Sequence, residues 1–424
     1  MSDTVATQLA IHGGPKAVTT NPGDLFDWMI TTSKDEEAVL EVLRRGAMSA
    51  WDVTLEFERE LAARFGSEHA LCFNNGTQAI RTAMWACGVH AGDEIICQSM
   101  TFWASALQVY SLGGTVVFAE MDPATLTLDP EDVERRITDR TKAIVCVHYC
   151  GYPTDMDAIM EIAARRHIMV IEDVSHAQGG LYKGRKLGTI GHVGAMSIMS
   201  EKSLACGEGG VLITGDDLLH QRAVAFGHYE RPDLLTNSEL APFAKLPMGG
   251  YKNRIHQMSA AVGRVQLRAY ADRMDEIQRA MNHFWDLLEG VPGVHAHRPP
   301  AASGSTMGGW YYAHGIYAPE ELGGLPLSRF CEALNAEGVP AAAGANFLLH
   351  LHPMLNDADV YGHGKPTRIA HSDRDLRQPA GSLPVSESLP ERTFSVPWFK
   401  HYRPDIIAAY AAGVRKVAEA AGEL

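Results

Sequence analysis

Short apolar runs alternate with longer amphipathic stretches along the first half of this chain. Apolar runs of this kind predict buried strands, and the stretches between them are long enough to hold the helices that parallel connections require. The pattern therefore predicts an α/β fold with a mostly parallel sheet that is covered on both faces. Strands are expected at 70–73, 94–97, 115–118, 143–147, 169–172, 195–198 and 210–214.

Two helices can be placed from their apolar stripes and their ends. The first has apolar residues spaced by four, with Asp52 as the expected N-cap and Gly66 at its C-terminal end; the stripe is Phe57, Leu61 and Phe65. The second is expected over 78–87, directly after the turn 74–77. Both flank the predicted strand 70–73, which they connect to the rest of the sheet.

The second half of the chain has a different pattern. A long helical periodicity over 258–281 predicts a helix that leads out of the large domain. Beyond it, a strand at 310–317 and a helix at 327–338 predict a smaller α+β domain. The polar segment 357–381, rich in His, Gly, Pro, Arg and Asp, is expected to form a long loop, either functional or a surface insertion.

Length and composition support more than one domain. The chain has 424 residues, which exceeds the size at which single cores stop growing, and its 46% hydrophobic content is enough for a large core. We expect a large domain over 1–280, including an N-terminal arm over 1–24, and a small C-terminal domain over 281–424.

Charge and cysteine content exclude several classes of protein. The formal net charge is −14, from 37 basic and 51 acidic residues, which argues against nucleic acid as a partner. Seven cysteines without repeated C-x-x-C spacing do not indicate a disulfide framework. The chain has no signal-peptide pattern and no apolar stretch long enough to cross a membrane, so we expect no membrane partner and a cytoplasmic location.

The most informative chemistry is the pair Asp173 and Lys202. Asp173 ends an apolar strand, and Lys202 follows 29 positions later, just before the glycine-rich turn 206–210. A lysine amine forms a Schiff base with the aldehyde of pyridoxal phosphate (PLP), and a carboxylate keeps a proton on the pyridine nitrogen, so the ring acts as an electron sink. The pair predicts a PLP enzyme, although a solvated loop lysine and a charged strand end are the simpler interpretations of each residue alone.

Gly76 and Thr77 open a predicted helix directly after a strand. The free N–H groups and the positive end of a helix dipole at such a position bind phosphate. A glycine-threonine turn is weak evidence by itself, but beside Asp173 and Lys202 it predicts the cradle for the PLP phosphate.

Over nearly its whole length the chain resembles the DegT/DnrJ/EryC1/StrS family of PLP-dependent sugar and cyclitol aminotransferases. The resemblance rests on ordered motifs such as Asn75–Ile80, Gly92–Ile96, Thr101–Ala104, Val147–Gly151, Glu172–Asp173 and Gly207–Gly210. It implies PLP-dependent aminotransferase fold type I, with PLP as cofactor. It also implies that Ser197 adds a hydroxyl to the cofactor site, that the ring of Trp103 stacks on the pyridine, and that His176 hydrogen-bonds the cofactor phenolate.

Further residues match or depart from the family pattern near the expected substrate mouth. The segment Gly249–Ile255 resembles one that reaches the cofactor phosphate of the neighbouring subunit through an asparagine. Here Lys252 occupies that position and Asn253 the next, so either is a candidate, and the resemblance implies a homodimer with shared active sites. Arg254 could bind a substrate carboxylate or form a structural ion pair. The resemblance implies that His350 faces the substrate.

His350 and His352 also permit a competing interpretation as metal ligands, because alternate residues of a strand share a face. No third ligand appears at a suitable spacing, so we expect no metal.

The favoured function is ping-pong transamination, in which the family implies glutamine or glutamate as donor and a keto cyclitol or keto sugar as acceptor, in amino-sugar or aminocyclitol antibiotic biosynthesis. Several alternatives stay open. They are a nucleotide-linked keto sugar as acceptor, aminotransfer with aromatisation of a dehydroshikimate-like ketone to an aminobenzoate, and a dehydratase, against which Lys202 weighs because the resemblance predicts histidine there. A non-enzymatic PLP-fold regulator is disfavoured, since no DNA-binding module is attached.

Overall fold

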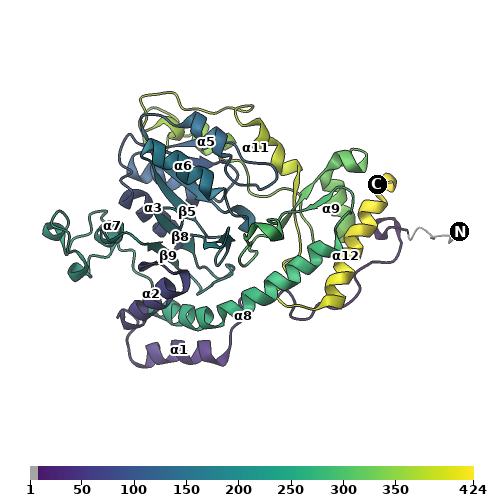
Figure 1. The fold of residues 1–424 in the computed structure, drawn as a ribbon, viewed down its shortest axis with the longest axis horizontal. Helices are drawn as coiled ribbons and strands as arrows, with labels where there is room; N and C mark the ends of the chain where they lie inside the picture. The colour runs from purple at the N-terminus through teal and green to yellow at the C-terminus, as the bar shows by residue number, and fades with distance from the viewer. Residues whose placement is uncertain (1–7) are drawn as a thin grey trace.

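A seven-stranded sheet forms the centre of the larger lobe, with strand order β1-β9-β8-β5-β4-β2-β3. The structure is a computed structural model that describes residues 8–424 (Figure 1). All neighbouring strands are parallel except β9, which is antiparallel to β1 and to β8. Each expected strand overlaps an observed one, so the predicted mostly parallel sheet is confirmed. The strands are β1 (His69–Phe73), β2 (Glu94–Gln98), β3 (Thr115–Ala119), β4 (Thr141–Val147), β5 (Met169–Asp173), β8 (Val193–Ser197) and β9 (Gly210–Thr214).

Helices cover both faces of this sheet. α2 (Asp52–Phe65) and α6 (Met156–Arg166) pack on one face, and α3 (Gly76–Ala86) and α7 (Asp217–Gly227) pack on the other. Side chains alternate between the faces as a strand requires, since Cys72 of β1 joins the core under α2 while Leu71 and Phe73 join the core under α3. The apolar runs of the sequence are thus strands buried on both sides.

The ends of α2 differ in part from the expectation. Trp51 is the N-cap, and Asp52 is the first helical residue. The Asp52 carboxylate instead accepts hydrogen bonds from Arg45 at 2.9 Å and from Gln257 at 2.8 Å, so it joins neighbouring segments rather than capping its own helix. Gly66 ends the helix at φ 73°, where a Cβ would be strained, as predicted.

The long helix α8 (Gln257–Leu287) carries the chain from the sheet to a second lobe, as Figure 1 shows. That lobe holds an antiparallel sheet of β10 (Val294–Ala296), β11 (His314–Tyr317) and β12 (Thr393–Ser395), with α9 (Leu327–Ala336) and α12 (Pro404–Glu419). The strand expected at 310–317 is shorter, because Trp310 and Tyr312 have positive φ values of 57° and 61° that no strand allows.

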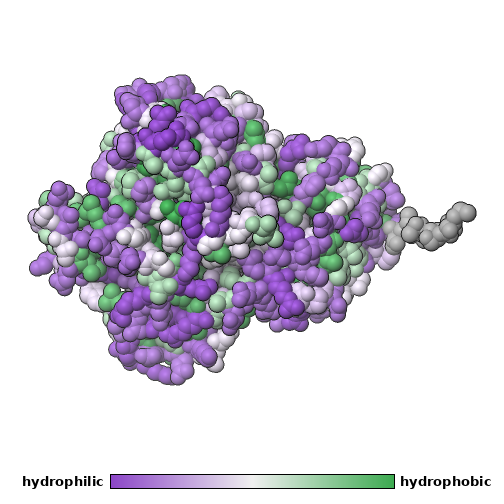
Figure 2. Space-filling view, in the orientation of Figure 1, coloured by the Kyte–Doolittle hydropathy of each residue, from purple (hydrophilic) through white to green (hydrophobic). Residues whose placement is uncertain are grey.

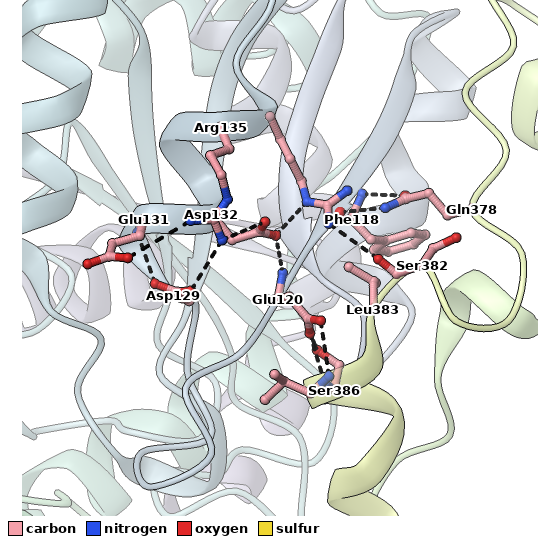
Figure 3. Close-up of polar contacts among 12 residues, drawn as sticks. Phe118, Glu120, Asp129, Glu131, Asp132, Arg135, Gln378, Ser382, Leu383 and Ser386 are labelled. Carbon is pink, nitrogen blue, oxygen red and sulfur yellow. Dashed lines mark hydrogen bonds and ion pairs between the residues drawn. The ribbon is translucent and has the colours of Figure 1, made fainter.

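The C-terminal part of the chain does not remain in the second lobe. Residues 346–391 return to the edge of the large sheet, where Gln378 accepts from the Phe118 N–H at 3.0 Å and donates to the Phe118 carbonyl at 2.7 Å. The Glu120 carboxylate accepts from the Ser386 N–H and hydroxyl at 2.8 and 2.6 Å (Figure 3). Within this part, 357–381 is an irregular loop with one short 3-10 turn, as expected.

The N-terminal arm, which was expected to belong to the large domain, contacts the smaller lobe. Among its described residues, Ala10 and Ala17 donate their N–H groups to Glu337, at the end of α9, at 2.8 and 2.9 Å. Residues 1–7 of the expected arm lie outside the described residues. The expected boundary at residue 280 falls inside α8, so the division into domains stays a prediction.

The remaining elements are short or peripheral, and no helix among residues 8–424 combines the length and the hydrophobicity needed to cross a bilayer. They are α1 (Ser33–Arg44), α4 (Ala104–Leu107), α5 (Pro130–Arg136), α10 (Pro353–Asn356), α11 (Pro384–Ser388), β6 (Leu181–Tyr182) and β7 (Arg185–Lys186).

Candidate active site

A cavity of about 300 Å³ lies at the carboxyl ends of the central strands. Val147, Asp173 and Ser197 line it, and they are the last residues of β4, β5 and β8. Crevices at this edge of an open parallel sheet are the usual ligand sites of α/β folds. The second lobe closes the cavity with Tyr311 and Tyr312. Six of the residues singled out from the sequence meet here: Gly76, Thr77, Asp173, His176, Ser197 and Lys202.

Asp173 is buried and held in one orientation. One carboxylate oxygen accepts from the Ser105 hydroxyl at 2.6 Å, and the other accepts from the Ser175 N–H at 3.0 Å. The Ser175 hydroxyl in turn accepts from the Ser197 N–H at 2.9 Å. The sequence reasoning missed both serines; Ser175 could have been found from its spacing of two after Asp173, whereas Ser105 carries no local signal.

Lys202 is buried, and its ammonium lies 3.8 Å from the centre of the Tyr311 ring. Burial lowers the pKa of its amine from the ordinary lysine value to about 8, and the nearby Asp173 charge opposes this shift. The Lys202 carbonyl accepts from Trp28 Nε1 at 2.9 Å, so the N-terminal segment also fixes its backbone. Neither Tyr311 nor Trp28 was expected beside this lysine, because no local pattern connects these distant positions.

The start of α3 faces the same cavity. Asn75 caps the helix by accepting from the Gln78 N–H at 2.9 Å, and Gly76 and Thr77 follow as the first helical residues. Their N–H groups make no hydrogen bond within residues 8–424. A Cβ on Gly76 would lie 2.7 Å from the Ser197 Cα and Cβ, so only glycine lets these two elements approach so closely.

His176 lines the wall between the two lobes. Its Nδ1 accepts from the Cys150 N–H at 3.3 Å, which leaves Nε2 as the protonated nitrogen of the neutral ring. Burial, and then the positive charge of Lys202, hold its pKa well below the usual histidine value. The rings of Tyr311 and Tyr312 lie 5.1 and 5.7 Å from the imidazole, so the neutral His176 offers one N–H donor in an aromatic wall.

The structure places Phe102, and not Trp103, on the cavity wall. Trp103 is the N-cap of α4 and is 41% exposed, and Phe102 is 48% exposed. Phe102 is therefore the aromatic side chain of this segment that lines the cavity, and the stacking role of Trp103 stays a prediction.

Lys252, Asn253 and Arg254 do not line the cavity. Lys252 is exposed. Asn253 is buried, and its amide donates to the Thr82 hydroxyl at 3.3 Å. Arg254 donates to the Ser49 carbonyl at 3.2 Å and lies 3.9 Å from the buried Glu230 carboxylate, which favours the structural ion pair over the substrate contact.

His350 does not face the cavity either. It is fully buried, and its ring bonds the Ser99 hydroxyl at 2.7 Å and the Glu387 carboxylate at 3.1 Å. The segment Leu349–Leu351 is a 3-10 turn, and His352 caps α10, so the strand geometry that would align the two imidazoles is absent there. Among residues 8–424, no three His, Cys, Asp or Glu side chains are grouped so as to hold a metal.

The donors and acceptors of the cavity fit PLP. The free N–H groups of Gly76 and Thr77 and the Ser197 hydroxyl suit its phosphate, Asp173 suits its pyridine nitrogen, and Lys202 suits its aldehyde. His176 and Phe102 suit the phenolate oxygen and one ring face.

Comparisons with known proteins match the chain along most of its length. The profile of the DegT/DnrJ/EryC1/StrS aminotransferase family matches residues 30–414. An L-glutamine:2-deoxy-scyllo-inosose aminotransferase of Streptomyces kanamyceticus is 34% identical over 385 residues, covering 86% of each chain. The spore coat polysaccharide biosynthesis protein SpsC of Bacillus subtilis is 30% identical, covering 83% of this chain and 90% of that protein. An aminotransferase structure from Psychrobacter cryohalolentis is 29% identical with a TM-score of 0.79, covering 92% and 97%.

Proposed function

We propose that this chain, which belongs to the DegT/DnrJ/EryC1/StrS aminotransferase family, transfers the amino group of glutamine or glutamate to the ketone carbon of a free keto cyclitol. The protein is a PLP-dependent aminotransferase of fold type I. The finer assignment of donor and acceptor draws support from the inosose aminotransferase to which it is similar. The aminotransfer itself is supported by the meeting of Asp173, Lys202 and the start of α3 around one cavity.

The residues of the cavity divide the chemical work. PLP, when bound, supplies an electron sink for the carbanion that forms at the amino-acid Cα. Asp173, fixed by Ser105 and Ser175, keeps a proton on the pyridine nitrogen. With the cofactor bound, the Lys202 amine would take the proton from the donor Cα and deliver it to the C4′ carbon of the cofactor. With a pKa of about 8, part of this amine is neutral at pH 7 and able to accept a proton.

The loop 357–381 supports a cyclitol over a nucleotide-linked sugar. A diphosphate requires several free cations at the site. The arginines of this loop are already occupied, because Arg377 pairs with Asp375, Arg374 pairs with Glu94, and Arg368 is buried against Gln378. None of them lines the cavity.

We also propose a homodimer in which Lys252 reaches the cofactor phosphate of the neighbouring subunit. The segment between α7 and α8 projects from the large lobe in Figure 1, and Figure 2 shows hydrophobic groups on it. Its exposed apolar side chains include Leu246 at 77% and Phe243 at 54%. Lys252 is exposed on this segment whereas Asn253 is buried, so the lysine is the available donor.

We propose that the protein works in the cytoplasm and takes part in the biosynthesis of an aminocyclitol antibiotic. The seven cysteines are all buried free thiols, as expected for a protein of a reducing compartment. The inosose aminotransferase relative supports the pathway type.

The deciding experiment offers ketones to the amino form of the loaded enzyme. A panel of scyllo-inosose-like ketones, nucleotide-linked 3-keto and 4-keto sugars and a dehydroshikimate-like ketone is compared by kcat/KM, with glutamine and glutamate as donors. We expect the inosose-like ketones to be preferred by at least tenfold, with Lys202→Ala as the inactive control. Preference for the nucleotide-linked sugars would refute the acceptor, and formation of an aminobenzoate would favour the aromatising reaction.

A further inference from the structure

A second hollow lies in the smaller lobe, apart from the catalytic cavity. It has a volume of about 540 Å³ and runs between the turn 340–342 after α9 and the segment 395–400 after β12. None of its lining residues lines the catalytic cavity. We name it the Lys400 groove; it is lined by Phe26, Asn335, Pro340, Ala341, Ala342, Ser395, Val396, Pro397, Trp398 and Lys400.

Lys400 is the unexplained residue of this groove. Its side chain is 5% exposed, and its ammonium lies 3.4 Å from the centre of the Trp398 ring. Among residues 8–424 its only hydrogen-bond acceptor is the Trp398 carbonyl at 3.1 Å, and no carboxylate pairs with it. A buried ammonium has three donors and needs a compensating charge, and neither a carbonyl nor an aromatic face supplies one in full, so burial lowers the pKa of this amine to about 7.

The other polar side chains of the groove add donors and no carboxylate that could pair with Lys400. Ser395 Oγ accepts from the Ala342 N–H at 2.9 Å, which leaves its own proton to donate. Trp398 Nε1 is buried and makes no hydrogen bond within the described chain. The Asn335 amide is consumed, since its nitrogen donates to the Cys331 and Ala341 carbonyls and its oxygen accepts from the Ala341 N–H.

We propose that the Lys400 groove binds a compact oxyanion, a small carboxylate or phosphate, through Lys400 and Ser395. The ligand supplies the negative charge that the ammonium lacks, and the apolar wall of Phe26 and Pro397 suits a short carbon chain.

The groove is one aromatic layer away from the catalytic lysine. Trp398 meets Tyr311 edge to face at 5.8 Å, and Tyr311 lies under the Lys202 ammonium. Trp28, 5.5 Å from Trp398, donates to the Lys202 carbonyl. These aromatic contacts connect the Lys400 groove to the side chain and backbone of Lys202. Anion binding in the groove does not depend on which ketone is the acceptor.

The test is calorimetric titration of the PLP-loaded protein with succinate and, separately, with inorganic phosphate. The bound cofactor fills the phosphate cradle of α3, so added phosphate reports on another site. We expect saturable binding of at least one probe, and at least tenfold weaker binding in Lys400→Met, since that variant removes the charged hydrogen-bond donor. The better probe identifies the carboxylate or the phosphate class.

Two further variants test whether the loss of binding is specific to the Lys400 groove. Ala342→Glu places a carboxylate on the groove wall and should abolish binding without removing Lys400. Lys365→Met is the matched control, because Lys365 also donates to a backbone carbonyl but lies on the exposed loop 357–381. Absence of binding to the unaltered protein, or binding that persists in both Lys400→Met and Ala342→Glu, would overturn the proposal.

Discussion

At the scale of single residues, the clearest distinction is between two neighbouring aromatic side chains. Phe102 lines the catalytic cavity and Trp103 does not. Phe102→Ala should weaken PLP binding by about tenfold, because a stacked ring contributes roughly 0.5–1.5 kcal/mol beyond the area it buries. Trp103→Ala is the matched comparison and should change PLP affinity less than twofold, measured by absorbance titration of the apoprotein. The reverse order would restore Trp103 to the stacking role.

The lowered pKa of Lys202 predicts a pH dependence. Its folded-state pKa of about 8 lies below the ordinary lysine value of 10.5, so the amine becomes neutral and nucleophilic at a lower pH than a surface lysine. The rate at which the apoprotein combines with PLP should therefore rise with pH and level off above about pH 8. Borohydride reduction and peptide mapping should place the cofactor on Lys202.

The lowered pKa of Lys202 also makes the stability of the protein depend on pH. Between pH 8 and 10.5 the unfolded chain holds a proton on this lysine that the native state has lost, so this residue makes the protein more stable as pH rises. Replacing Lys202 with Met should flatten that part of the stability curve, measured by denaturant unfolding. For the rate of PLP binding, the contradicting result is a rate that keeps rising up to pH 10 in the unaltered apoprotein, because the Lys202 amine would then have an ordinary lysine pKa.

At the scale of elements, the cradle depends on how closely α3 approaches β8. Gly76→Ala would put a Cβ 2.7 Å from the Ser197 backbone, which cannot move without disturbing the sheet. We expect a loss of about 1–3 kcal/mol in unfolding free energy and a large increase in the Kd for PLP. Gly215→Ala is the control, because no atom lies within 4 Å of its added Cβ. Equal effects from the two changes would show that the close approach is unimportant.

At the scale of the whole molecule, the proposed dimer predicts complementation. Lys202→Ala protomers lack the catalytic amine, and Lys252→Ala protomers lack the donor offered to the neighbouring site. Each should have little activity alone. An equal mixture, unfolded and refolded together, should recover about a quarter of the normal activity, because half of the dimers are mixed and each has one intact site of two. A fully active monomer in analytical ultracentrifugation would end the shared-site proposal.

The sequence by itself determined the main architecture and the central chemistry. Alternating faces of short apolar strands are a local property, so the sheet and helices α2 and α3 followed from spacing alone. Asp173 and Lys202 were paired from their chemistry, whereas Ser197 was assigned to the same site from the family resemblance; Asp173 and Ser197 lie at strand ends that meet at one edge of the sheet.

Only the tertiary structure decided which other side chains reach that cavity and which do not. Ser105 lies in the short helix α4, and Tyr311 and Asn346 lie in irregular segments of the chain; all three line the cavity, and no periodicity of the sequence indicates this. The family resemblance implied that His350 faces the substrate, but in the structure His350 is buried against Ser99 and Glu387. Local patterns fix elements, whereas the long-range contacts that orient turns and loops exist only once the whole chain has folded.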